Sequence, residues 1–214
     1  MSSDALVTVN SETEPSPAPS PPQPSRNRRQ EETFRKVLAA GMETLREHSY
    51  GDLTVRMVAA RAKVAPATAY TYFSSKNHLI AEVYLDLVRQ VPYFTDVNEP
   101  MPSRVHRALR HLALVVADEP EVGAACTAAL LGGGPDPAVR AVRERIGAEI
   151  HRRIASAIGP GAQPGCAAAL QMAFFGALVQ AGSGELTYHE IADRLADVAS
   201  LILSGAEQRA RGDE

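Results

Sequence analysis

Apolar residues recur at the three- and four-residue spacing of an amphipathic helix over most of the sequence, and this spacing constrains the fold more than any other feature. No segment alternates polar and apolar residues for long enough to predict a strand. Clusters of proline and glycine interrupt the pattern and divide it into successive helices. The sequence therefore predicts an all-α protein of about nine helices. The first apolar stripe consists of Phe34, Val37, Leu38, Gly41, Met42 and Leu45.

The chain divides into four predicted parts. Residues 1–26 contain six prolines and too few apolar side chains to offset the entropy of ordering, so they predict a disordered tail. Residues 27–74 predict a small helical head and residues 75–206 a larger helical body, followed by a flexible tail at 207–214. The helices of the body are expected near residues 104–118, 120–131, 138–158, 164–182 and 188–206.

Residues 54–73 combine two short predicted helices with a tight turn. Thr54 is a suitable N-cap for the first, and Lys63-Val64 forms the turn. Pro66 suits the first turn of the second helix, where its missing N–H costs nothing. Ser74 or Ser75 then caps a longer helix that ends before Pro92. Two short helices joined in this way form a helix-turn-helix unit, whose second helix enters the major groove of DNA.

The segment TVRMVAARAKVAPATAYTYFSSKNHL closely resembles the DNA-binding signature of the TetR family of transcription regulators. The resemblance extends from Arg29 to about Leu79. It departs from the family pattern at Lys63, where the family usually has glycine, and at Ala67-Thr68-Ala69, where it often has Gly-Thr-Leu. A side chain at Lys63 has to accept a strained backbone or an altered turn. The matching positions are Thr54, Ala59, Ala62, Val64, Thr68, Tyr70, Tyr72, Phe73, Ser75, Lys76 and Leu79.

The resemblance implies specific DNA-contacting residues. Hydroxyls and an ammonium group suit contacts to the DNA backbone, and small side chains with a methyl or hydroxyl group suit base edges. Arg28, in the basic run 26–29 before the first helix, is expected to follow phosphates or enter the minor groove, unless the run is only solvated charge. Phe73 is expected in the core, and packing with a wet hydroxyl is the alternative for both tyrosines. The backbone set is Thr54, Tyr70, Tyr72 and Lys76, the base-reading set is Pro66, Ala67, Thr68 and Thr71, and Arg56 suits either.

The body is expected to form a homodimer and to hold a small-molecule effector. Two heads on two half-sites one helical turn apart are the usual way for such a small unit to gain affinity, so a dimer is predicted through the helices near 164–182 and 188–206. The first is rich in Ala and Gly, and the second carries Ile191, Leu195, Val198 and Ile202 at helical spacing. An intramolecular core is the alternative for these helices. The predicted effector pocket is lined by Leu109, Leu112, Val116, Leu130, Ile146, Ile150, Met172 and Phe175, each of which is alternatively plain core.

Charge and motif content separate the possible functions. Residues 26–90 carry four more basic than acidic side chains although the whole chain has a net charge of −3, as expected for a nucleic-acid-facing part. No catalytic or metal-ligand motif is present, and no cofactor or metal is expected. Cys126 and Cys166 lack any ligand spacing and predict buried free thiols in a reducing cytoplasm. No secretory signal or membrane span is predicted.

The sequence thus favours a sequence-specific transcription regulator that binds a double-stranded DNA operator. The resemblance implies a repressor that an unidentified small molecule releases from its operator. The alternative is a helical small-molecule-binding protein without DNA binding, and the basic, hydroxyl-rich head favours the first function.

Overall fold

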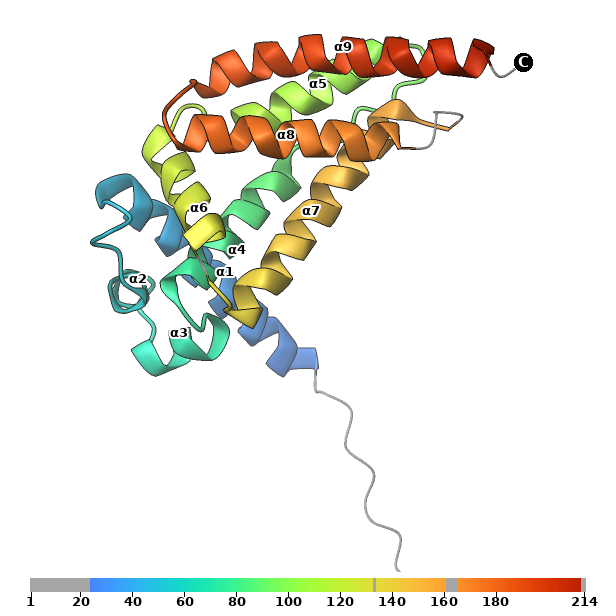
Figure 1. Cartoon of the computed structure of the whole chain (residues 1–214). Helices are drawn as coiled ribbons and strands as arrows, with labels where there is room; N and C mark the ends of the chain where they lie inside the picture. The colour runs from blue at the N-terminus through green and yellow to red at the C-terminus, as the bar shows by residue number, and fades with distance from the viewer. Residues whose placement is uncertain (1–23, 133, 161–164, 213–214) are drawn as a thin grey trace, which may run out of the picture.

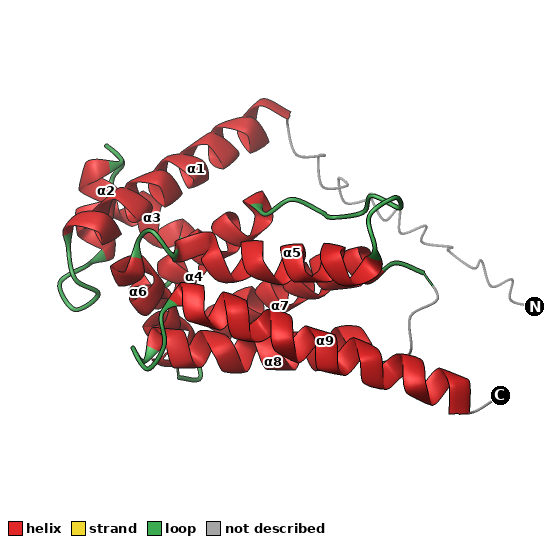
Figure 2. Ribbon diagram, turned by 90° about the horizontal axis from the view of Figure 1, so that it is seen from above, coloured by secondary structure: helices red, strands yellow, loops and turns green. Residues whose placement is uncertain are grey.

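The computed structural model describes residues 24–132, 134–160 and 165–212, and within these ranges every regular element is helical (Figure 2). The all-α class is therefore confirmed, with nine α-helices and one short 3₁₀ helix in the described part. The bounds are α1 Pro24–Glu47, α2 Val55–Arg61, α3 Pro66–Tyr72, α4 Lys76–Gln90, α5 Met101–Ala113, η1 Leu114–Val116, α6 Pro120–Gly132, α7 Pro137–Ile158, α8 Cys166–Gly182 and α9 Tyr188–Gly212.

Helices α1, α2 and α3 form the head, at the opposite end of the molecule from α8 and α9 (Figure 1). The first helix begins at Pro24, inside the segment predicted as a tail, because proline is well tolerated in the first turn of a helix. Residues 1–23 of that predicted tail lie outside the described residues. At the other end, α9 continues to Gly212, so most of the predicted tail at 207–214 is helical.

Helix α4 joins the head to the body. Eight of its fifteen residues are buried, because it packs against α1 on the head side and against α6 and α7 in the body. Its start is fixed by Ser75, whose hydroxyl accepts a hydrogen bond from the amide of His78 at 3.1 Å. Its end falls just before Pro92, as predicted. The helix is therefore in contact with both halves of the molecule.

The body is a bundle in which α9 packs along α5 and α8, and α7 packs along α4 and α5. Helices α8 and α9 lie side by side along one edge of the molecule (Figure 1). Between residues 24 and 212, as described, no helix is long and apolar enough to span a bilayer.

The turn between α2 and α3 contains a residue in the left-handed region. Lys63 has a φ of 55°, which confirms the strain expected where the family usually has glycine. The amide of Lys63 donates to the carbonyl of Ala60 at 3.1 Å, and that of Val64 donates to Ala59 at 3.0 Å. This is the Schellman pattern that closes a helix C-terminus, and the side chain of Val64 packs against the buried Ala59. The hydrogen bonds hold the turn in place despite the lysine.

Replacing Lys63 by glycine should raise the free energy of unfolding by about 1 kcal/mol, because it removes the contact of Cβ with the backbone in the left-handed conformation. Part of the gain is offset by the greater freedom of glycine in the unfolded chain. Urea denaturation of the purified protein measures the change. Lys63→Ala is the control, since it removes the charge but keeps Cβ, and equal stability of the two variants would contradict this explanation.

Candidate functional site

Helix α3 presents one face to the head and the other to solvent. Ala69 is fully buried against Val55 and Ala59 of α2, and Phe73, just after the helix, is fully buried in the main core, as predicted. The opposite face carries the exposed residues Pro66, Ala67, Tyr70 and Thr71. The sequence places small buried residues on one side of a seven-residue helix, so its other side is free to meet a partner.

The hydroxyl groups predicted to contact DNA differ in their surroundings. Tyr70 is 48 % exposed. Tyr72 is half-buried, and its ring packs edge-on against Phe34 with the centroids 6.1 Å apart. Thr68 is half-buried, and the hydroxyl of Thr71 donates to the carbonyl of Ala67 at 3.0 Å. Tyr70 is therefore the most accessible aromatic hydroxyl on this face, and Tyr72 has a clear packing role.

Residues around α2 complete the outer surface of the head. Thr54 caps α2, as predicted: its hydroxyl accepts a hydrogen bond from the amide of Met57 at 3.2 Å. Arg56 is exposed in the first turn of this helix. Arg28 is also exposed, but it lies within α1 and not in an arm that precedes it. The position of the basic run is thus a correction to the prediction from sequence.

Lys76 is half-buried and makes hydrogen bonds within the protein. Its ammonium group donates to the carbonyl of Tyr50 at 2.9 Å and to that of Gly51 at 3.3 Å. It also lies 4.3 Å from the centre of the Tyr50 ring. Two of its three N–H groups are therefore occupied in closing the loop between α1 and α2, which leaves one for the phosphate contact predicted from the family resemblance.

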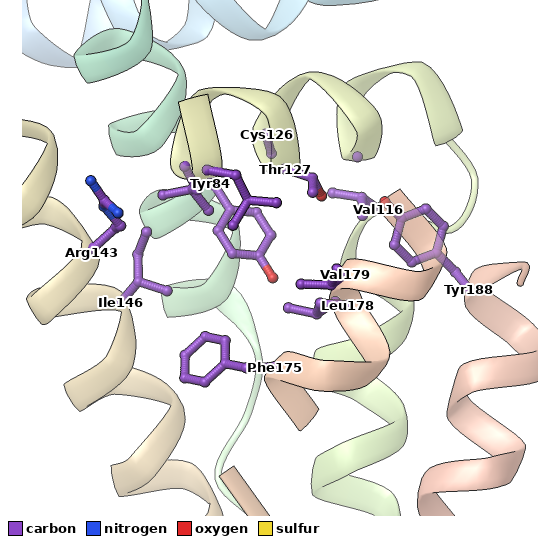
Figure 3. A pocket seen from close by; sticks show the side chains of 13 residues that line it. Tyr84, Val116, Cys126, Thr127, Arg143, Ile146, Phe175, Leu178, Val179 and Tyr188 are labelled. Carbon is purple, nitrogen blue, oxygen red and sulfur yellow. The ribbon is translucent and has the colours of Figure 1, made fainter. Parts of the chain in front are cut away.

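A cavity of about 300 Å³ lies in the body between α4, α6, α7, α8 and the start of α9 (Figure 3). Its walls are mainly apolar. Each of these helices contributes a side chain: Tyr84 from α4, Cys126 from α6, Ile146 from α7, Phe175 from α8 and Tyr188 from α9.

Burial favours the uncharged forms of the two phenols and the thiol in the cavity wall. Tyr84 is only 3 % exposed, and its hydroxyl has no hydrogen-bond partner among the described residues. Burial raises its pKa far above the ordinary value for tyrosine. Burial likewise raises the pKa of the Cys126 thiol to about 12 and also raises that of the Tyr188 hydroxyl. At neutral pH the cavity thus offers a phenol that can donate a hydrogen bond.

The comparisons with known proteins agree on one family. A family model described as "Bacterial regulatory proteins, tetR family" matches residues 37–83. A protein of Mycobacterium tuberculosis (strain ATCC 25618 / H37Rv), named an uncharacterized HTH-type transcriptional regulator, is 76 % identical over 212 residues, which cover 99 % of each chain.

This chain belongs to the TetR family of helix-turn-helix transcriptional regulators.

Solved TetR structures share its fold. A TetR transcriptional regulator from Rhodococcus sp. RHA1 aligns with a TM-score of 0.69 at 20 % identity, covering 84 % of this chain and 98 % of that one. A tetR-family transcriptional regulator from Streptomyces coelicolor aligns with a TM-score of 0.56 at 18 % identity, covering 84 % and 83 % of the two chains. The family membership favours the transcription regulator over the alternative function considered from the sequence.

Four of the eight residues predicted for the effector pocket line this cavity. Val116, Leu130, Ile146 and Phe175 line the cavity. The other four predicted residues do not. Leu109, Leu112 and Ile150 are fully buried in the packed core, and Met172 is 76 % exposed on α8. Helical spacing showed that these positions are apolar but not which neighbour each one faces.

The residues that the sequence did not single out are the polar ones in the cavity wall. Tyr84 lies on α4 beyond Leu79, where the resemblance to the DNA-binding signature ends. Thr127 and Tyr188 lie at positions without any motif. Gly123 allows the Tyr188 ring to approach α6, since a Cβ at Gly123 would lie 2.1 Å from the tyrosine hydroxyl. The one signal in the sequence that could have identified a cavity residue is an aromatic hydroxyl on an apolar helical face, and only Tyr84 has it.

Polar contacts next to α3 join α4, the helix that follows the head of this TetR regulator, to α7. Ser75, which caps α4, also donates to the carboxylate of Asp136 at 3.0 Å, and Asp136 in turn caps α7. About two turns further along α4, the buried Glu82 accepts a hydrogen bond from Arg145 of α7 at 2.6 Å. The first half of α7 is therefore joined to α4 at two points, Ser75 just after the end of α3 and Glu82 about two turns later.

Proposed function

We propose that this TetR-family regulator is a repressor that binds its operator as a homodimer and dissociates when a small molecule occupies the cavity of the body. The observation that carries the proposal is the outward face of α3, where the exposed Pro66, Ala67, Tyr70 and Thr71 lie opposite a buried Ala69. A helix held by one face, with small and hydroxyl-bearing residues on the other, suits insertion into the major groove.

The proposed contacts follow from exposure. Tyr70 and Arg56 are the side chains best placed for phosphates, because both are exposed and both can donate hydrogen bonds. Pro66, Ala67 and Thr68 lie in the first turn of α3, the part of a recognition helix that meets base edges. We propose that the exposed Thr71 adds a base contact and that Thr54, Tyr72, Lys76 and Arg28 add contacts to the DNA backbone.

The proposed dimer interface lies chiefly on α8. This helix contains no charged residue, and its exposed positions include Ala168, Met172, Phe175, Gly176 and Val179. Their spacing places them on one face that a second copy would bury.

Only part of α9 is available for the proposed dimer interface, whereas the prediction from sequence used the whole helix. Ile191 and Leu195 are buried within the subunit, so the intramolecular alternative is correct for them. Val198 and Leu201, which are 36 % and 75 % exposed, remain available to a second copy. The part of α9 proposed for the dimer is therefore its second half.

The proposed release mechanism passes through α4 and α7. Tyr84 and Ile146 bring these two helices to the cavity, and the Ser75–Asp136 and Glu82–Arg145 contacts join the same helices beside α3. A ligand that shifts either helix changes the orientation of the heads. Ligand and operator then oppose each other through one coupling free energy, typically about 1–3 kcal/mol.

Selection of bound fragments from host genomic DNA tests the function directly. The expected result is a two-fold symmetric motif with half-sites one helical turn apart. A variant with Ala67→Asp, which places a negative charge on the exposed face of α3, is the matched control and should recover no motif. Recovery of the same fragments by both proteins would contradict the assignment of α3. Increased transcription of the adjacent gene in a deletion strain would support repression, and decreased transcription would contradict it.

Removing the hydroxyl of Tyr70 should weaken operator binding by a dimer about a hundredfold or more. Hydrogen bonds to charged acceptors contribute about 1.5–3 kcal/mol each, and the dimer would lose two of them. Because phosphates carry no base identity, Tyr70→Phe should weaken all sequences by the same factor. Tyr93→Phe is the control, because Tyr93 is 47 % exposed, close to the 48 % of Tyr70, but lies in the loop after α4. Equal operator affinity of the two variants in a titration at fixed salt would remove Tyr70 from the interface.

A further inference from the structure

We propose that the cavity binds an uncharged, mostly apolar molecule whose hydrogen-bond acceptor, such as a ketone or ester carbonyl, is held by the hydroxyl of Tyr84. The inference deepens the proposed function, on which it rests for the claim that the occupant is the effector. It makes a separate statement about the chemical class of the occupant.

The hydroxyl of Tyr84 is the central observation. Tyr84 is 97 % buried, being 3 % exposed, and its hydroxyl has no partner among the described residues. An unpartnered buried hydroxyl costs stability, and a phenylalanine would fill the same space without that cost. The side chain lines the cavity, and Figure 3 shows its hydroxyl directed toward Leu178 and Val179 on the opposite wall. A ligand atom that accepts a hydrogen bond from this hydroxyl would satisfy it.

The charges around the cavity favour a neutral occupant at that point. Arg143 is the one charged side chain that lines the cavity in the described part of the chain. The residue is partly exposed, although its Nε atom is buried and has no hydrogen-bond partner among the described residues. In Figure 3 its guanidinium group lies at the edge of the site, on the side away from the Tyr84 hydroxyl. An anion beside Tyr84 would lose its hydration without a cation next to it, which is more costly than burying a carbonyl.

The other walls of the cavity favour a ligand that is apolar apart from its acceptor. Val116, Ile146, Phe175 and Leu178 contribute apolar surface inside the cavity. Leu131 and Val179 line it while 63 % and 46 % exposed, so its apolar lining continues to the protein surface. A ring system of naphthalene size that carries one carbonyl group matches this combination of apolar walls and a buried phenol without a hydrogen-bond partner among the described residues.

Three naphthalenes of similar shape test the chemical class. We would measure the binding of 2-acetylnaphthalene, 2-ethylnaphthalene and 2-naphthoate by calorimetry and by their fluorescence, which the protein hardly obscures because it contains no tryptophan. The ketone should bind about fivefold more tightly than the ethyl compound, as expected for one hydrogen bond, and at least about tenfold more tightly than the carboxylate.

Two variants assign the hydrogen bond. In Tyr84→Phe, the ketone and the ethyl compound should bind with about equal affinity, because the hydrogen bond to the ketone is lost. The affinity of the ethyl compound itself should not change. Tyr188→Phe is the matched control, because it also removes a phenolic hydroxyl from the cavity wall and should preserve the advantage. The melting temperature of the ligand-free Tyr84→Phe protein should equal or exceed that of the wild type, which verifies the fold.

The possible results separate this inference from the proposed function. Tighter binding of 2-naphthoate, an unchanged advantage of the ketone in Tyr84→Phe, or no binding of any of the three compounds would overturn the assigned class. Operator release is measured independently. If the order of affinities holds but saturating ketone leaves the operator complex intact, the inference stands and the release mechanism fails.

Discussion

Glutamate in place of Met172 is expected to turn the protein into a monomer and to lower its affinity for a two-half-site operator about 10²–10⁴-fold, the factor that linkage of two binding modules typically provides. Met172 is 76 % exposed at the centre of the uncharged face of α8. A carboxylate there would be buried without a partner when a second copy docks, and its desolvation opposes association. Each monomer would then hold only one head against one half-site.

Sedimentation and operator titration of the same samples measure both parts of this prediction. Val97→Glu is the control, because Val97 is 88 % exposed in the loop between α4 and α5 and gains the same charge away from α8. It should remain dimeric with wild-type affinity. A dimeric Met172→Glu protein would place the interface elsewhere, and a monomeric one with unchanged affinity would show that one head suffices.

Replacing Arg153 by methionine should lower the free energy of unfolding by about 3–5 kcal/mol, the range found when one partner of a buried ion pair is removed. Arg153 is 2 % exposed and donates to the carboxylate of Glu149, itself 8 % exposed, at 2.5 Å. It also donates to the carbonyls of Arg89 and Val91 at the end of α4, at 2.8 and 2.9 Å. The substitution therefore removes the buried donor to this carboxylate and leaves the two carbonyls at the end of α4 without the donor from Arg153.

Arg152 provides a matched control for this prediction. It pairs with the same carboxylate of Glu149, but its side chain is 57 % exposed, so Arg152→Met should cost only about 0–1 kcal/mol. Denaturation of both variants at neutral pH measures the difference. Similar losses would mean that burial does not determine the strength of this pair.

The same pair predicts how stability depends on pH. Burial alone raises the pKa of Glu149, but the hydrogen bond from Arg153 and the charges of Arg152 and Arg153 outweigh it, so the pKa is lowered overall. A carboxyl group whose pKa is lower in the folded state stabilises the protein above its unfolded pKa, and this contribution is lost as the pH falls through the folded value. Acid titration of stability should therefore be steeper for the wild type than for Arg153→Met.

The head could be predicted in detail because its signals are local. Thr54 and Ser75 are side-chain caps whose hydrogen bonds span three residues, and Pro66 fixes the start of α3 by its own geometry. The strain at Lys63 likewise followed from one position in one turn. These features depend on neighbours in the sequence and need no knowledge of the tertiary packing.

The body could be predicted only in outline, because its faces are set by distant contacts. Helix α8 is uncharged on every side, so its sequence does not tell the exposed Met172 from the buried Phe174. Similarly, Leu109 and Phe175 are both apolar residues at helical spacing, yet only Phe175 borders the cavity. Periodicity identifies apolar residues, whereas the partner of each one depends on how the helices cross.

Phe175 and Val179 lie in the wall of the cavity and are also 37 % and 46 % exposed on the outer face of α8. If a second subunit covers that face, the two equilibria share side chains and are thermodynamically linked. Measured ligand affinity would then vary with protein concentration, and a mutation that adapts the sensor to a new compound would also alter how strongly the subunits hold together.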